Sequence, residues 1–141
     1  MPSPCHALLV HLNGNLPATT TCLDGSTTGQ VSPAISVDGD CSIKKAVWIY
    51  WDANWQGACI GFVGEGRANL TDYDSCHSEI ECYNWNDQAS SFTTGCSGVD
   101  FFTDINAEGD WAYSDPYEGH NFPYQGVGND QLSSIVILNN C

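Results

Sequence analysis

Basic residues are scarce in this sequence. Its 141 residues include three Lys and Arg against 17 Asp and Glu, which gives a formal net charge of −14. Binding to nucleic acid or to an anionic membrane requires a basic surface, so the composition argues against both kinds of partner. The acidic residues are concentrated, since 13 of the 17 lie between Glu65 and Asp130. Acidic groups crowded in this way repel one another, and bound cations would relieve the repulsion.

Helical and catalytic patterns are also missing. No segment longer than about eight residues repeats its apolar positions every 3.6 residues, and no apolar run reaches the length of a transmembrane helix. Gly-x-Ser-x-Gly, His-Glu-x-x-His and P-loop patterns do not occur. Because the sequence offers no catalytic constellation, we expect a protein that is not an enzyme.

Cysteine, in contrast, is abundant. The eight cysteines include no Cys-x-x-Cys pair, which disfavours a zinc ribbon or a thioredoxin-like site. An even number in a short, lysine-poor chain predicts disulfides and an oxidising compartment. The start, MPSPCHALLV, has no charged segment typical of a signal peptide, so we interpret the chain as a mature, secreted extracellular protein with an added Met. Eight cysteines allow 105 pairings, and the sequence does not select among the candidates Cys5, Cys22, Cys41, Cys59, Cys76, Cys82, Cys96 and Cys141.

Short β-branched and aromatic runs alternate with Gly- and Asp-rich turns about every ten residues, which predicts an all-β sandwich or barrel. Residues 1–45 differ, being rich in Thr, Ser, Gly and Pro. Such a segment is too small to form its own core, so we expect an N-terminal extension packed on a main domain at 46–141 and pinned by a disulfide. Strands are predicted within the extension at 7–12 and 34–37.

The main domain contains an internal repeat. The phrase NDQASS at 86–91 returns as NDQLSS at 129–134, with five of six residues identical at an offset of 129 − 86 = 43. Upstream, YWDANWQG at 50–57 corresponds to FTDINAEG at 102–109, each with an aromatic residue seven positions before a glycine. The chain therefore holds two copies of one unit. A unit of four strands with a folded hairpin is a Greek key, and two Greek keys packed face to face share one core.

These motifs carry a family resemblance. Tyr50, Trp55 and Gly57 open the first unit, and Phe102 and Gly109 open the second, where Ala107 replaces the usual aromatic and Trp111 is expected to fill its volume. Together with the two NDQxSS phrases they resemble the microbial, calcium-binding branch of the βγ-crystallin superfamily. The resemblance covers residues 46–141 and implies two four-stranded Greek keys, at about 46–96 and 97–141.

The resemblance further implies two Ca²⁺ sites, each assembled from both units. The acid and the fifth-position Ser of each phrase would supply side-chain oxygens, and the residue after the acid would supply its backbone carbonyl. A carbonyl from each opening hairpin would complete the shell, which suits a hard cation that takes six to eight oxygens. The last serines, Ser91 and Ser134, would instead tie each hairpin to its own strand. The predicted ligands are Asp87, Gln88, Ser90, Asp130, Gln131, Ser133, Ala53 and Ile105.

The resemblance and the composition together predict a secreted, monomeric, calcium-binding protein whose two Greek keys are clamped by calcium and which is not an enzyme. Asn-Asp is also a common turn dipeptide, so turn chemistry alone remains an alternative for each phrase. A secreted protease inhibitor or antimicrobial killer toxin on the same fold, acting on a protein target, is a second alternative. A carbohydrate-binding module is a third, although the simpler interpretation of Trp48, Trp51, Trp55, Trp85 and Trp111 is core and hairpin packing. Asn69 begins an N-glycosylation sequon.

Overall fold

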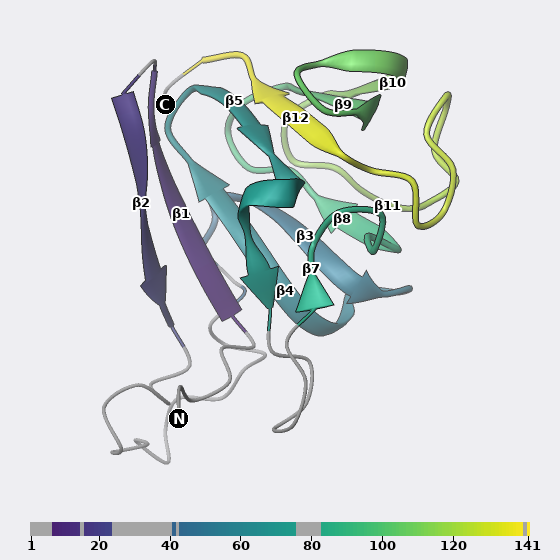
Figure 1. The fold of residues 1–141 in the computed structure, drawn as a ribbon, viewed down its shortest axis with the longest axis horizontal. Coiled ribbons are helices and arrows are strands. Elements are labelled where there is room, and N and C mark those ends of the chain that lie inside the picture. The colour runs from purple at the N-terminus through teal and green to yellow at the C-terminus, as the bar shows by residue number, and fades with distance from the viewer. Residues whose placement is uncertain (1–6, 15, 24–40, 42, 76–82, 140) are drawn as a thin grey trace.

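The structure is a computed structural model that describes residues 7–14, 16–23, 41, 43–75, 83–139 and 141. It confirms the predicted all-β class, with one short 3₁₀ helix and no α-helix among the described residues (Figure 1). The predicted strand at 34–37, together with Cys5, Cys76 and Cys82, lies outside the described residues. The elements are β1 (Ala7–Asn13), β2 (Leu16–Cys22), β3 (Val47–Asp52), β4 (Gln56–Val63), β5 (Gly66–Asn69), η2 (Leu70–Asp72), β6 (Asp74–Ser75), β7 (Tyr83–Asn84), β8 (Ser91–Thr93), β9 (Val99–Asp104), β10 (Glu108–Ser114), β11 (Gly119–Asn121) and β12 (Ser134–Ile137).

The two Greek keys exchange strands. One sheet has the order β11-β8-β3-β4-β1-β2, a second has the order β10-β9-β12-β5, and β6 pairs with β7 in a small third sheet. The first key contributes β3, β4 and β8 to the larger sheet but sends β5 across to pair with β12. The second key contributes β9, β10 and β12 to the other sheet and sends β11 across to pair with β8. Because each sheet contains a strand of both keys, the keys are interlocked.

The N-terminal segment extends the larger sheet. Strand β1 pairs antiparallel with β2 and parallel with β4, in a register that runs from Ala7 opposite Cys59 to His11 opposite Val63. In Figure 1 the β1–β2 hairpin lies at one side of this sheet, beside β4. A disulfide joins Cys41 to Cys59 in β4, and Cys22 at the end of β2 is also disulfide-bonded. The prediction that disulfides pin this segment to the crystallin-like part is thus confirmed.

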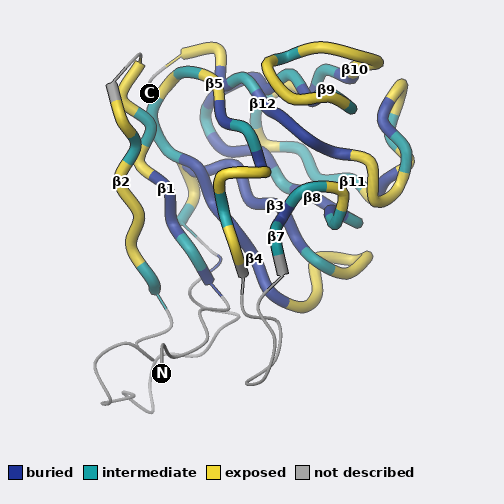
Figure 2. Tube along the Cα trace, viewed as in Figure 1, coloured by how far each residue is buried: buried dark blue, intermediate teal, exposed yellow. Residues whose placement is uncertain are grey.

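The main core lies between the two large sheets. Figure 2 shows buried stretches along the strands that face each other. Phe92 of β8 and Phe101 of β9 are fully buried at its centre, with ring centroids 4.5 Å apart, and Phe122 packs 5.3 Å from Phe92. Phe92 and Phe101 belong to different Greek keys, so burial of these rings holds the two keys together. No helix among the described residues is long and apolar enough to cross a membrane.

The prediction that the tryptophans serve core and hairpin packing is wrong for Trp111, whereas Trp55 braces the first hairpin through its indole bond to the Phe92 carbonyl. Trp48 and Trp85 are buried, but Trp55 is 47% and Trp111 is 58% exposed. Trp111 therefore does not fill the volume that Ala107 leaves open. Successive side chains of a strand point to opposite faces, and the neighbouring Ala112 is the residue of β10 that faces the core. Trp111 consequently faces solvent.

Candidate metal centre

The two opening hairpins have the same unusual backbone. Asn54 and Trp55 in the first, and Asn106 and Ala107 in the second, all have φ between 58° and 62°. This left-handed region is uncommon for residues other than glycine and requires support from neighbouring groups. The support comes from the last serine of each NDQxSS phrase, as described next.

Ser91 and Ser134 hold these hairpins in place, which confirms the structural role predicted for them. Both are fully buried. The Ser91 hydroxyl donates to the Asp52 carbonyl at 2.7 Å and accepts from the Trp55 N–H at 3.0 Å. The Ser134 hydroxyl donates to the Asp104 carbonyl at 2.6 Å and accepts from the Ala107 N–H at 3.0 Å. Each serine thus positions the hairpin turn beside its own phrase.

A pair of asparagines that sequence reasoning did not place in this network also supports the hairpins. Asn121 Oδ1 accepts from the Asn54 N–H at 2.7 Å, and Asn69 Oδ1 accepts from the Asn106 N–H at 2.8 Å. Each bond crosses from one Greek key to the other. The sequence did contain a signal for this pairing. Asn69 and Asn121 are 121 − 69 = 52 residues apart, and Asn54 and Asn106 are also 106 − 54 = 52 residues apart, so the two pairs occupy equivalent positions in the two units. The Asn69 amide nitrogen of the sequon donates to Asn106 Oδ1 at 3.1 Å, so Asn69 has a structural role here.

The two NDQxSS phrases lie against each other in a reciprocal arrangement. The Asp87 N–H donates to the Leu132 carbonyl at 3.0 Å, and the Asp130 N–H donates to the Ala89 carbonyl at 3.1 Å. Both aspartates are left-handed, with φ of 63° and 59°. The same backbone shape in both copies therefore brings the acid of each phrase beside the end of the other phrase.

Each aspartate consequently meets the serine of the opposite unit. Ser133 Oγ lies 3.2 Å from Asp87 Oδ1, and Ser90 Oγ lies 3.2 Å from Asp130 Oδ1. Two oxygens that bind one Ca²⁺ at about 2.4 Å and at right angles are about 3.4 Å apart. The observed separations fit two ligands of a shared calcium ion, and they arise twice in the same molecule.

The other predicted ligands are residues that would bind calcium through their backbone carbonyls. Gln88 and Gln131 directly follow the two aspartates, and the Gln131 side-chain oxygen accepts from the Gly128 N–H at 3.2 Å. This leaves the backbone carbonyl as the oxygen that Gln131 offers elsewhere. Ala53 and Ile105 occupy equivalent positions in the hairpin turns, just before the left-handed residues. Ile105 is exposed, which does not matter for a ligand that uses its carbonyl oxygen.

The donor set contains few carboxylates. Among the described residues no three His, Cys, Asp or Glu side chains form a cluster. One carboxylate with a hydroxyl and backbone carbonyls is nevertheless a suitable oxygen set for calcium. The Asn86 amide nitrogen, which sequence reasoning did not assign a role, donates to Asp87 Oδ2 at 3.2 Å, and the Asn86 Oδ1 is buried and accepts no hydrogen bond. An acceptor left in this way costs free energy unless a water or a cation satisfies it.

Comparisons with solved structures identify the same architecture elsewhere. A structure concerned with the evolution of the eye lens βγ-crystallin domain fold matches at TM-score 0.52 and 19% identity, covering 68% of this chain and 87% of that one. A βγ-crystallin from an archaeon matches at TM-score 0.51 and 19% identity, covering 66% and 96%. A βγ-crystallin from Ciona intestinalis matches at TM-score 0.50 and 20% identity, covering 65% and 98%. No protein-family profile matches the sequence, and no curated protein matches it.

Proposed function

We propose that this chain, which has the βγ-crystallin superfamily fold, binds two Ca²⁺ ions that clamp its two Greek keys together. One observation carries the proposal: each phrase places its aspartate 3.2 Å from the serine of the other phrase. One ion would be held by Asp87 and Ser133, with the carbonyls of Gln88 and Ile105. The other would be held by Asp130 and Ser90, with the carbonyls of Gln131 and Ala53.

The assignment of hairpin carbonyls to sites follows from the two structural serines. Ser91 binds the first hairpin and directly follows Ser90, so this hairpin lies beside the Ser90–Asp130 pair. Ser134 binds the second hairpin and directly follows Ser133, so that hairpin lies beside the Ser133–Asp87 pair. Each proposed site therefore takes oxygens from both keys, which is the geometry that a clamp requires.

The expected effect of calcium is added stability. A ligand that binds only the folded state stabilises it by RT ln(1 + [L]/Kd), which is about 1.4 kcal/mol per site at tenfold excess over Kd. Extracellular calcium modules have Kd values of about 10⁻⁴ to 10⁻³ M, and a site with one carboxylate belongs in that range. Two positive ions would also reduce the repulsion in a chain of net charge −14.

The proposed setting is extracellular. Disulfides link Cys41 to Cys59 and Cys96 to Cys141, and such bonds persist in oxidising compartments, where calcium is also plentiful. Because disulfides constrain the unfolded chain, we expect the calcium-free protein to be folded already. Calcium would then rigidify and stabilise the fold instead of triggering folding.

Calorimetric titration of EDTA-stripped protein with CaCl₂ tests the proposal, together with melting curves with and without calcium. We expect two sites in the parent, one in Asp87→Ala or Asp130→Ala, and none in the double variant. The calcium-dependent rise in melting temperature should be largest in the parent, smaller in each single variant and absent in the double variant.

The control for charge alone is Asp110→Ala, since Asp110 is an exposed acid on β10 that belongs to neither phrase and is not a proposed ligand. It should keep both sites. An absence of binding heat in the parent would refute the proposal, as would an unchanged calcium response in the double variant.

A further inference from the structure

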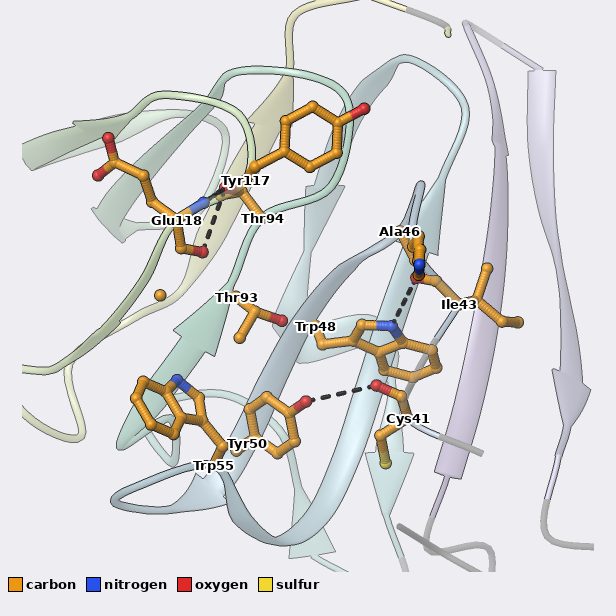
Figure 3. Close-up of a pocket in the computed structure, with 12 residues that line it drawn as sticks. Cys41, Ile43, Ala46, Trp48, Tyr50, Trp55, Thr93, Thr94, Tyr117 and Glu118 are labelled. Atoms are coloured by element: carbon orange, nitrogen blue, oxygen red, sulfur yellow. Dashed lines mark hydrogen bonds between the residues drawn. The ribbon is translucent and has the colours of Figure 1, made fainter. Parts of the chain in front are cut away.

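A cavity of about 570 Å³ opens beside the first hairpin, and neither aspartate–serine pair lines it (Figure 3). Its walls come from the segment before β3, from β3 itself, from the first hairpin, and from the residues around 93–94 and 117–119. Four aromatic residues line it: Trp48, Tyr50, Trp55 and Tyr117. The volume lies within the range of about 300–1,000 Å³ that is usual for small-ligand sites, which are mostly apolar with a few polar groups.

Trp55 gives this cavity a rigid aromatic wall. Its indole N–H donates to the Phe92 carbonyl at 3.0 Å and its backbone N–H donates to Ser91 Oγ at 3.0 Å, yet its side chain is 47% exposed. A left-handed φ of 60° is unfavourable for so bulky a residue. The equivalent position of the second hairpin holds Ala107 with φ of 58°, so the second hairpin has no counterpart of this aromatic wall.

Gly119 packs closely against this ring and leaves little room for a side chain there. A Cβ atom at that position would lie 3.2 Å from both Trp55 Nε1 and Thr93 Cγ2. Tyr117, on the opposite side of the cavity in Figure 3, is 73% exposed. The exposed rings of Trp55 and Tyr117 therefore border a cavity that is also lined by Trp48 and Tyr50.

The charge at the cavity is unlike that of the rest of the chain. The sequence has three basic residues, and one of them, Lys44, is exposed and lines the cavity. Among the described residues that line the cavity the acid is Glu118, whose carboxylate is 3.0 Å from His120 Nε2 and points away from Tyr50 and Trp48 in Figure 3. Lys44 is therefore the lining group that can pair with an anion.

We propose that this cavity binds an acidic sugar residue of an oligosaccharide, with the pyranose ring stacked on Trp55 and its carboxylate paired with Lys44. A sugar ring offers an apolar C–H face and a polar edge, which matches a cavity lined by the Trp55 indole, a lysine and Thr93. A purely apolar ligand would make no ion pair with Lys44, and a small inorganic anion would make no contact with the aromatic wall. This inference does not depend on calcium binding.

Oligogalacturonate is a suitable probe, and its fully methyl-esterified form is the matched control because esterification removes the charge and keeps the sugar chain. Binding is measured by tryptophan fluorescence and calorimetry in EDTA, so that calcium held by the oligomer or by the protein plays no part. We expect the acidic oligomer to bind at least tenfold more tightly than the ester. Lys44→Ala should bring the two affinities within about twofold of each other.

Trp55→Ala should weaken binding at least tenfold, Trp55→Phe should weaken it less, and Trp111→Ala, which removes an exposed tryptophan elsewhere, should leave it unchanged. If Trp55→Ala does not melt cooperatively, Tyr117→Ala provides the same test and should weaken binding at least threefold. The proposal fails if neither oligomer binds, if the ester binds as tightly as the acid, or if both Trp55→Phe and Tyr117→Ala bind like the parent. Because calcium is absent throughout, these outcomes are independent of the proposed clamp.

Discussion

The two adjacent serines of each NDQxSS phrase should contribute to different properties. The second should support the stability of the fold, and the first should support calcium binding. Ser91 is fully buried and makes two short hydrogen bonds to the first hairpin. Ser90 has its hydroxyl at the protein surface, 3.2 Å from Asp130 Oδ1. We predict that Ser91→Ala destabilises the fold with or without calcium, whereas Ser90→Ala chiefly weakens one calcium site.

The size of the Ser91→Ala effect follows from the groups it leaves behind. The Asp52 carbonyl and the Trp55 N–H both lose their partner. A buried group left unsatisfied costs about 1–3 kcal/mol, and since the hairpin is partly exposed to water the lower part of that range applies to each. The loss is then about 2–3 kcal/mol, and at about 3–4 °C per kcal/mol the melting temperature should fall by about 6–12 °C.

Urea unfolding in EDTA and in excess calcium measures both effects on one pair of variants. Ser90→Ala should lower the unfolding free energy in EDTA by less than about 0.5 kcal/mol, as expected for a surface change, but should lose about half of the calcium-dependent gain. Ser133→Ala and Ser134→Ala provide the same comparison in the second key. The reasoning is refuted if Ser91→Ala and Ser90→Ala are equally destabilising in EDTA, or if Ser91→Ala alone removes a calcium site while the fold keeps its stability.

Two other substitutions test energetic features of the fold. Burial raises the pKa of the Asp100 carboxyl, so the ionised side chain lowers the free energy of unfolding at neutral pH. Asp100→Asn should therefore raise the melting temperature slightly at pH 7. Melting curves recorded at decreasing pH should show this difference disappear as the pH falls below the raised pKa. Replacing both Cys96 and Cys141 by Ser opens a loop whose ends are 45 residues apart, which should cost about 4 kcal/mol in urea unfolding, and a loss below about 1 kcal/mol would contradict the chain-entropy account.

The repeat was the most informative feature of the sequence. Turn chemistry alone would allow NDQASS and NDQLSS to lie anywhere on the surface. Two copies in register with two opening motifs implied pseudo-symmetric units, and pseudo-symmetry explains why Asp87 meets Ser133 while Asp130 meets Ser90. The buried serines were predictable for the same reason, because a hydroxyl that ends a turn and begins an apolar strand has few partners other than the neighbouring hairpin.

Other features depend on contacts that no local pattern specifies. The parallel pairing of β1 with β4 joins residues about 50 positions apart, and the alternation in ALLVHL predicts a strand but not its neighbour. The exposure of Trp111 was missed because composition assigns tryptophan to the core, whereas the face that Ala112 occupies decides which way the side chain points. The cross-key asparagine bonds join side chains of one key to backbone of the other, and no motif within a single unit specifies them.

The two copies have diverged at one structurally equivalent position, and this difference separates the two proposed activities. Both hairpins have the same left-handed backbone and the same serine support, so both retain what a calcium site needs. The first hairpin alone carries a bulky aromatic side chain, Trp55, where the second carries Ala107. An alanine at this position would keep the backbone hydrogen bond to Ser91 but would lose the bond that the Trp55 indole N–H donates to the Phe92 carbonyl at 3.0 Å, so the tryptophan also braces its hairpin. Its exposed ring borders the aromatic cavity that Lys44 also lines, and this position is where the proposed ligand would stack.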